Sequence, residues 1–320
     1  MSGRPKKHHV VPRVYLDRFK DEDGRVTVWS KRRGKELRSL PKDTLVRHHY
    51  YSQPVDGQDN FDQTIEIKLW NNVENNLSSL IQSIVDKSQV DLALLCETLL
   101  SMVIRSPAFR EPFEIGLADY VDRQVKQMDK SDFPAPPAGL ENIWDQVKVS
   151  IDPHRSIHGM HRYLIDYASK ITFFSYRVLK AKRGSCFLTS DNPVVWFKLG
   201  KNASLQEVTP INFDKATRCV FPLDKKHLLY GKPNPQRDIK LIAQPRQATA
   251  SEVTLLNSVQ AGCCWDHLVG NMRLPKKHRD YYLSVAPSFH LDFYDPNTGA
   301  FTLSSVDLAP LRKKSKFIRR

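Results

Sequence analysis

The spacing of apolar residues changes from helical to strand-like near the middle of this chain. From Phe61 onward, apolar residues recur at steps of three and four, which marks one helix face: Ile65, Leu69, Val73, Leu77, Leu80, Ile81 and Ile84. Residues 91–105 are strongly apolar and predict a buried helix that ends at Pro107. Further helices are predicted over 111–128, 139–149 and 153–169. A helical region, about 61–169, therefore fills the middle of the chain.

Strand-like segments lie on both sides of this helical region. Residues 24–30 alternate polar and apolar side chains, and 35–40 continue them as a hairpin. After Ser169 come short runs rich in β-forming residues, at 172–179, 185–189, 194–197, 218–222 and 227–230. A last helix is predicted at about 246–268. This order predicts an α+β fold, with the helical middle region packed on a mostly antiparallel sheet in a single domain.

The predicted domain boundaries follow from the same pattern. A chain of 320 residues is long enough to bury a substantial core. We expect one domain over residues 8–305, made of the helical part and a sheet-rich part at about 170–295. A basic N-terminal tail, 1–7, and a basic C-terminal tail, 306–320, would flank it.

Positive charge is concentrated at the ends of the chain and in one loop. The net charge is +14, and the two tails carry most of it. The loop holds Lys31, Arg32 and Arg33, which we expect to contact substrate. Such groups suit a phosphate backbone, so nucleic acid or another phosphate-bearing ligand is the predicted partner. Basic tails that only improve solubility would give the same composition.

Several classes of protein are disfavoured by what the sequence lacks. It has no run of 18 apolar residues and no apolar segment after its basic start, so we expect no membrane partner. Its five cysteines form no C-x-x-C pair, which favours reduced thiols and a cytoplasmic location. It also lacks a phosphate-cradling glycine loop, a dinucleotide fingerprint and a nucleophile elbow.

The first candidate site segment is the N-terminal stretch 8–19, which begins His-His-Val-Val-Pro-Arg. Its apolar residues recur at helical spacing, so we expect the segment to dock into the fold: Val11, Val14, Tyr15 and Phe19. Docking would carry His9 and Arg13 into the interior as a catalytic base and a phosphate-stabilising cation. His8 and Tyr15 are the predicted substrate contacts of this segment.

The second candidate segment is Thr-Ser-Asp-Asn-Pro at 189–193, between two predicted strands. Its side chains suit a tight turn, because Ser, Asp and Asn bond to nearby backbone. The same turn could present Asp191 as a catalytic base or metal ligand, with Ser190 and Asn192 as substrate contacts. We predict that His9 and Asp191 meet.

Two further groups complete the predicted site. Glu66 and Glu74 share a helix face and, with Asp191, could bind a divalent cation such as Mg²⁺ or Mn²⁺ through oxygen ligands. A solvated polar face would show the same pattern. Arg105 lies on the predicted buried helix and needs a partner, because an unpaired buried charge is costly. We predict Asp191 or a substrate phosphate as that partner and count Arg105 among the catalytic residues.

The chain resembles an uncharacterised family, widespread in bacteria and catalogued as domain of unknown function 4238. The resemblance runs from about His8 to Asn271 and rests on the N-terminal segment, the Arg-Ser-Pro at 105–107 and the Phe-Leu-Thr-Ser-Asp-Asn-Pro-Val at 187–194. Relatives often carry Arg-Thr-Pro at 105–107. The resemblance implies a single α+β domain with no settled activity, and it places the two candidate segments in one shared design.

These features support two functional hypotheses. One is a metal-dependent nuclease or phosphodiesterase, and the resemblance adds a bacterial defence or toxin role. The other is a non-catalytic nucleic-acid-binding or interaction protein, in which the His, Arg and Asp residues form a structural network.

Overall fold

The computed structural model describes residues 7–48, 50–51, 53–54, 61–62, 70–128, 135–136, 139, 155–199, 205–208, 217–271, 275–298 and 300–311. Helices and several mostly antiparallel sheets confirm the predicted α+β class. The helix predicted at 139–149 lies outside the described residues, apart from Gly139.

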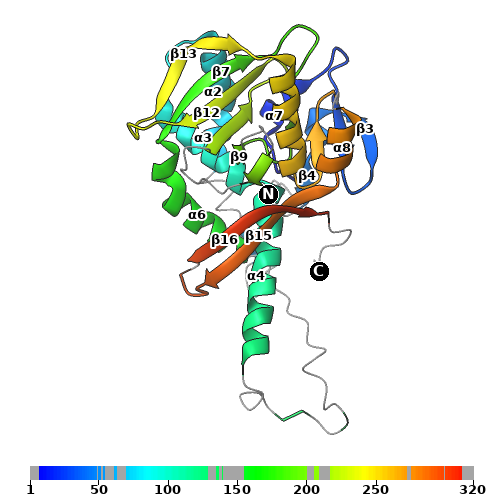
Figure 1. The fold of residues 1–320 in the computed structure, drawn as a ribbon, viewed down its shortest axis with the longest axis vertical. Coiled ribbons are helices and arrows are strands. Elements are labelled where there is room, and N and C mark those ends of the chain that lie inside the picture. The colour runs from blue at the N-terminus through cyan, green and yellow to red at the C-terminus, as the bar shows by residue number, and fades with distance from the viewer. Residues whose placement is uncertain are drawn as a thin grey trace, which may run out of the picture.

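The largest sheet has six strands in the order β10-β9-β11-β12-β7-β13. Their bounds are Leu205–Val208, Val195–Leu199, Thr217–Pro222, His227–Pro233, Phe174–Lys180 and Lys240–Gln247. All neighbours pair antiparallel except β13 and β7, which run parallel. This sheet forms the upper body in Figure 1.

A second sheet joins segments from three parts of the chain. Its four strands are β3 (Lys35–Ser39), β2 (Val26–Ser30), β14 (His267–Val269) and β8 (Thr189–Ser190), in that order. The predicted hairpin at 24–40 is therefore confirmed. The helix predicted at 246–268 was too long, because His267 and Leu268 belong to β14, which pairs with β2 and β8. Of the predicted strand at 185–189, only Thr189 lies in a strand, at the start of β8.

Three two-stranded ribbons complete the β structure. They are β1 (Lys7–His9) with β4 (Val46–His48), β5 (Gln53–Pro54) with β6 (Phe61–Asp62), and β15 (Val285–Tyr294) with β16 (Phe301–Pro310). β16 continues past the expected end of the domain at 305, and Val306 within it is buried. The predicted C-terminal tail therefore begins inside a strand.

The described helices largely follow the apolar pattern. They are α1 (Arg13–Leu16), η1 (Asp17–Phe19), η2 (Pro41–Asp43), α2 (Asn71–Asp86), α3 (Leu92–Ile104), α4 (Pro107–Gln127), α6 (Arg155–Ile171), α7 (Ala250–Cys263) and α8 (Lys276–Tyr282). A capping box of Thr249 and Glu252 starts α7 after the predicted 246. Phe61, where a helix was predicted to begin, lies in strand β6.

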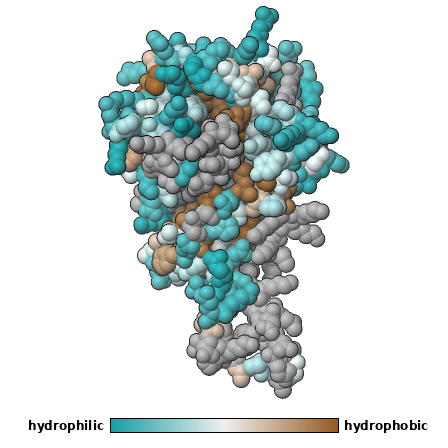
Figure 2. Space-filling model, in the orientation of Figure 1, coloured by the Kyte–Doolittle hydropathy of each residue, from teal (hydrophilic) through white to brown (hydrophobic). Residues whose placement is uncertain are grey.

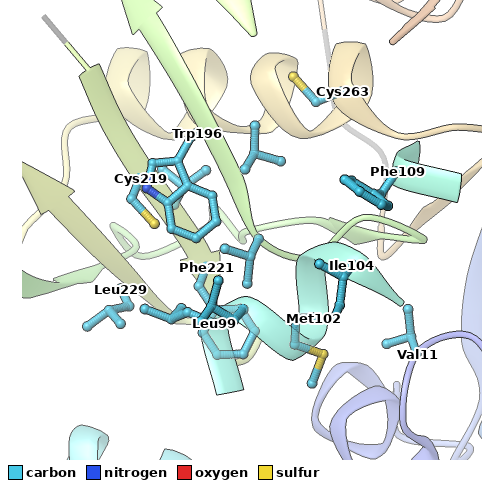
Figure 3. Close-up of a cluster of buried hydrophobic side chains, with 14 of the residues drawn as sticks. Val11, Leu99, Met102, Ile104, Phe109, Trp196, Cys219, Phe221, Leu229 and Cys263 are labelled. Carbon is cyan, nitrogen blue, oxygen red and sulfur yellow. The ribbon is translucent and has the colours of Figure 1, made fainter. Parts of the chain in front are cut away.

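The core forms where α3 packs against the large sheet. Figure 3 shows Leu99, Met102 and Ile104 facing Trp196, Phe221 and Leu229, with Val11 and Cys263 nearby; all are buried. Burying such side chains stabilises the fold by about 1.5–3 kcal/mol each. Figure 2 shows hydrophobic residues in a band across the middle of one face, with hydrophilic residues around it.

Helix α4 is buried on all sides over its first three turns, because residues 107–118 are all buried. The β15–β16 ribbon crosses it (Figure 1), and a Cβ at Gly116 would lie 2.6 Å from the carbonyl oxygen of Phe289. Polar residues in this part of α4 therefore need partners inside the protein.

No single described helix is long and apolar enough to cross a membrane. Helices α3 and α4 pass that test only as a pair, with a bend of 51° between them.

Candidate anion-binding site

The N-terminal segment docks into the fold, as predicted. Val11, Tyr15 and Phe19 are buried, whereas Val14 is exposed. The Tyr15 hydroxyl donates to the carbonyl of Pro222 at 2.6 Å and lies 2.7 Å from the Thr189 hydroxyl. Burial raises the pKa of Tyr15 well above its usual range, so the phenol stays protonated. Tyr15 therefore anchors α1 to β8 and β11, and has no exposed surface for substrate.

Arg13 and His9 do not take the predicted interior positions. The Arg13 side chain is 60% exposed, and its Nε lies 3.8 Å from the Asp17 carboxylate. His9 Nε2 is 3.1 Å from the carbonyl of Lys42. No contact joins His9 to Asp191, so the prediction that they meet was wrong.

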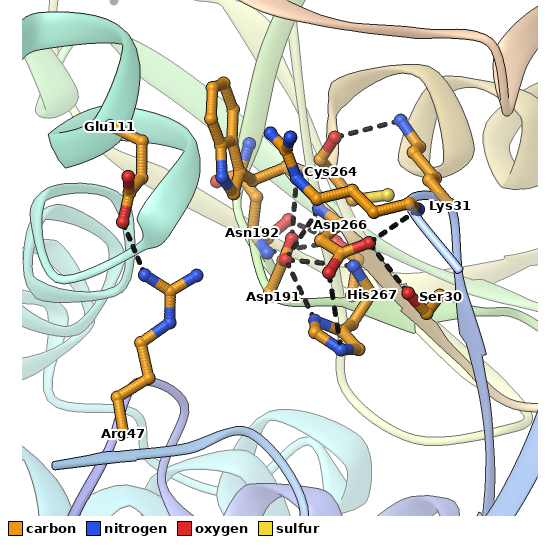
Figure 4. Close-up of polar contacts among 12 residues, drawn as sticks. Ser30, Lys31, Arg47, Glu111, Asp191, Asn192, Cys264, Asp266 and His267 are labelled. Atoms are coloured by element: carbon orange, nitrogen blue, oxygen red, sulfur yellow. Dashed lines mark hydrogen bonds and ion pairs between the residues drawn. The ribbon is translucent and has the colours of Figure 1, made fainter. Parts of the chain in front are cut away.

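Asp191 is completely buried and holds the chain at the end of α7 (Figure 4). Its carboxylate accepts three backbone N–H groups, from Trp265, Asp266 and His267, at 2.8–2.9 Å. Burial alone would raise the pKa of Asp191, but the His267 ring and these amides outweigh it and lower the pKa. Because both carboxylate oxygens are occupied by the backbone, Asp191 acts as a structural acceptor that turns the chain into β14.

The side chains on either side of Asp191 also form hydrogen bonds inside the protein. The Ser190 hydroxyl bonds Gln260 Oε1 at 2.9 Å, and Asn192 Nδ2 donates to the carbonyl of Cys263 at 2.9 Å. Both residues are buried. The predicted substrate contacts Ser190 and Asn192 therefore fasten the turn to α7.

The basic loop also has internal roles. The buried Lys31 ammonium donates to the carbonyls of Gly262, Cys264 and Val285, at 2.7–3.3 Å, and so caps the C-terminal end of α7. The guanidinium of Arg32 lies 4.7 Å from the centre of the Trp265 ring. Arg33 is exposed. Lys31 is therefore a structural cation, and only Arg32 and Arg33 keep surface that a ligand can reach.

Arg105 is fully buried and has a carboxylate partner, although not the predicted one. Its Nη2 lies 2.8 Å from Glu74 Oε1 and donates to the carbonyl of His9 at 2.7 Å. Glu74, predicted as a metal ligand, therefore neutralises Arg105 in the place predicted for Asp191. The ion pair ties α2, α3 and β1 together.

Of the other two candidate metal ligands, the structure describes only Asp191. Glu66 lies outside the described residues, and Asp191 is bound by the 265–267 backbone. In the part of the chain that the structure describes, no three His, Cys, Asp or Glu side chains are placed to hold a metal ion.

A different group of charged residues gathers around the adjacent tyrosines Tyr50 and Tyr51. Arg47 and Arg110 place their guanidinium carbons 4.9 and 4.3 Å from the centre of the Tyr50 ring. Arg105 lies 5.8 Å from the Tyr51 ring centre, and the His8 ring centroid is also 5.8 Å from it. We call these residues, with Glu74, Glu111 and Glu114, the arginine–tyrosine cluster.

The carboxylates of the cluster come from α2 and α4. Arg47 donates to Glu111, while Arg110 donates to the carbonyl of Tyr50 and lies 3.3 Å from Glu114. Glu111, Glu114 and Arg110 all belong to the buried start of α4. Ion pairs in such a setting have to repay a large desolvation cost, so they are weak evidence for stability. A dense group of buried charges is a candidate functional site.

The cluster reaches solvent at Arg47 and at Glu74. The Arg47 side chain is 27% exposed and the Glu74 side chain 36%, against 9% for Glu111 and 1% for Arg105. Burial opposes the charge of Arg47, but Tyr50, Glu111 and Asp191 outweigh it and raise its pKa, so the guanidinium is permanently charged. Figure 4 shows Arg47 reaching toward Glu111 beside the Asp191 turn. His8, its cross-strand neighbour on β1, is buried.

A small pocket of about 40 Å³ lies between the Arg-Ser-Pro segment and the 189–193 turn, and it is lined by Ser106 of the first and Asn192 of the second. Its remaining lining is largely apolar, including Phe109 and Phe289. The pocket places these two segments next to each other, but its character does not suit an anion.

The sequence interpretation missed four members of this cluster: Arg47, Arg110, Glu111 and Glu114. One signal was available. Arg110, Glu111 and Glu114 stand directly after a strongly apolar helix, where α4 must also be buried. Their partners come from distant strands and loops, so spacing along the chain does not reveal the pairs.

The fold and the site define an α+β protein with a largely buried cluster of charges that reaches solvent at Arg47 and Glu74. The family described as Protein of unknown function (DUF4238) matches residues 7–273, which is most of the chain. The chain belongs to this family. No curated protein and no solved structure matches it.

Proposed function

We propose that the protein is a hydrolase that acts on a phosphodiester or other phosphate-bearing substrate, with nucleic acid as the first candidate. The observation that carries the proposal is the convergence of three arginines and one histidine on the Tyr50–Tyr51 pair, open to solvent at Arg47. Guanidinium groups bind phosphate in a two-pronged geometry, and their charge stabilises phosphate transition states.

The residues of the cluster have separate tasks in this proposal. Arg47 binds the substrate phosphate, because its guanidinium is the most exposed in the cluster. Glu111 accepts the proton of the attacking water as the new phosphorus–oxygen bond forms. The bond from phosphorus to the leaving oxygen then breaks, and solvent protonates that oxygen. Arg110 is a positioning residue whose guanidinium donates to the Tyr50 carbonyl, and the main-chain carbonyl of Arg105 accepts a hydrogen bond from the Tyr51 hydroxyl.

A cleavage assay tests the proposal. The substrates are end-labelled single-stranded RNA, single-stranded DNA and duplex DNA, each in EDTA, Mg²⁺ and Mn²⁺. Wild-type protein is compared with Arg47→Met and Glu111→Gln. The matched control is Arg162→Met, which removes an exposed arginine 3.0 Å from its own carboxylate partner, Asp166.

We expect cleavage by the wild type and the control, and a loss of about 10²–10³-fold in Arg47→Met. Glu111→Gln should lose a similar factor, since general bases contribute about 10²–10⁴-fold. Absence of cleavage of all three substrates in all three conditions would contradict the proposal for nucleic acid. Toxicity on expression that depends on Glu111 would extend it to a defence or toxin role.

A second function has its own supporting observation. Asp191, Ser190, Asn192 and Lys31 all satisfy backbone or side-chain partners inside the protein. That is the behaviour expected of a non-catalytic nucleic-acid-binding or interaction protein with a structural network. Binding of the labelled strands without cleavage would favour this alternative.

A further inference from the structure

A groove on the large sheet lies away from the arginine–tyrosine cluster and shares no residue with it. It holds a cavity of about 170 Å³ and is lined by seven residues of β7, β12 and β13: Ser175, Arg177, Leu179, Tyr230, Lys232, Ile242 and Arg246. These three strands lie side by side in Figure 1.

Strand register places the lining residues in rows on one face of the sheet. Arg177 on β7 is paired with Tyr230 on one side and Ile242 on the other. Ser175 is paired with Lys232 and with Lys240. Registered neighbours point to the same face. Cations therefore stand beside an aromatic ring and an apolar side chain.

The opposite face of β7 is the core face. Phe174, Tyr176 and Val178 are buried, while Ser175 and Arg177 between them are half-buried. Gly231 on β12 makes close packing possible on that core side, because a Cβ there would lie 2.7 Å from the Tyr176 ring. The groove therefore lies on the face of the sheet opposite the core, and its polar residues do not pack in the core.

The charges of the groove are unbalanced. Arg246 is paired with Glu252 at 2.6 and 2.9 Å. Across the described ranges, neither Arg177 nor Lys232 has an ion-pair partner, and Arg177 Nε is buried without a hydrogen bond. Lys232 lies 5.8 Å from the centre of the Tyr230 ring. A half-buried guanidinium with a buried donor and no carboxylate favours an anionic ligand.

We propose that this groove binds an organic phosphate, with the phosphate on Arg177 and Lys232 and a planar group over Tyr230 and Ile242. The phosphate supplies acceptors for the guanidinium and the ammonium. The planar group covers the apolar part of the groove and stacks on the Tyr230 ring, as bases stack on sheet aromatics. A free nucleotide and a single strand of nucleic acid present the same chemistry.

Isothermal titration calorimetry on the full chain tests this. The probes are inorganic phosphate, adenosine, AMP and a dodecamer of deoxythymidine. The variants are Arg177→Gln and Lys232→Ala. The control is Lys35→Ala, which removes an exposed lysine of the β2–β3 hairpin. Circular dichroism melts confirm that each variant is folded, and Lys232 is exposed, so its variant is expected to fold.

AMP should bind more tightly than either inorganic phosphate or adenosine, and both groove variants should weaken AMP at least tenfold while the control does not. Binding of the dodecamer alone, with the same variant dependence, would identify a strand as the source of the phosphate. Absence of binding to AMP and dodecamer, or equal weakening by Lys35→Ala, would overturn the proposal. Since no groove residue belongs to the cluster, loss of nuclease activity would not affect this test.

Discussion

Two polar regions of this protein lie side by side and use buried charge differently. At the Asp191 turn, three backbone amides bind one carboxylate, and Asp191 itself is completely buried. In the arginine–tyrosine cluster, several arginines and glutamates share a pair of tyrosines, and Arg47 reaches solvent. The first arrangement specifies a chain path. The second carries a desolvation cost, and the proposed function assigns it a phosphate-bearing ligand.

The comparison teaches that a conspicuous sequence motif need not carry the chemistry. The Ser-Asp-Asn-Pro turn is the more recognisable feature. However, its Asp191 and Asn192 side chains form hydrogen bonds with the backbone of 263–267. The cluster has no compact motif, because its members come from β1, β4, α2 and α4, from the end of α3 and from the two tyrosines that follow β4.

The largest expected effect is at Asp191. Asp191→Ala leaves three buried N–H groups without an acceptor, at about 1–3 kcal/mol each. We therefore expect a loss of at least about 4 kcal/mol in the free energy of unfolding, measured by urea denaturation. Near-wild-type stability would contradict the structural role of Asp191 and so remove its difference from the cluster.

Next in size is Arg105→Met. It leaves Glu74 without its partner and removes the donor to the His9 carbonyl. Breaking a buried ion pair from one side costs about 3–5 kcal/mol, and since Glu74 is 36% exposed we expect the lower end. Arg162→Met, the exposed control, should cost about 0.5 kcal/mol or less. Equal losses in the two variants would contradict a special role for Arg105.

Acid titration sharpens the comparison further. The pKa of Asp191 is lowered from its ordinary value of 3.8, so its charged form stabilises the folded state above that value. This stability is lost as the pH falls below about 4, through the lowered pKa in the folded state. The stability difference between wild type and Asp191→Asn should therefore shrink below pH 4. A difference that stays constant down to pH 2 would show that the charge of Asp191 contributes nothing.

The smallest expected effect is at Glu252, on the edge of the groove. Its pKa is lowered to about 2, chiefly by the hydrogen bond from Arg246. Glu252→Gln should cost about 1 kcal/mol or less at pH 7, because both side chains are more than a third exposed. The loss should disappear between pH 4.5 and 2, followed by urea denaturation at each pH. A larger effect, persisting at pH 2, would point to the helix cap at Thr249 instead.

Local patterns predicted the fold well where they agreed with burial. The alternation in 24–30 gave β2, and the apolar run before Pro107 gave α3. The pattern failed at 264–268, where hydrogen bonds from the backbone of 265–267 to Asp191 turn the chain into β14 instead of continuing the helix. Local propensity contains no information about that carboxylate.

The site was predictable only in part. The need of Arg105 for a partner follows from its place in an apolar helix, and the structure supplies one in Glu74. The sequence does not show which carboxylate pairs with Arg105, or that Arg47 and Arg110 meet at Tyr50. Both depend on packing between segments that are far apart in the chain, about 60 residues for Tyr50 and Arg110. One sequence provides no measure of such contacts.

The most direct test is the rate of cleavage of labelled RNA by Arg47→Met at a temperature where it and the wild type are both folded. We predict a fall of about 10²-fold or more with the fold retained, while Arg162→Met keeps the wild-type rate. An unchanged rate in folded Arg47→Met would contradict the assignment of the arginine–tyrosine cluster as the site.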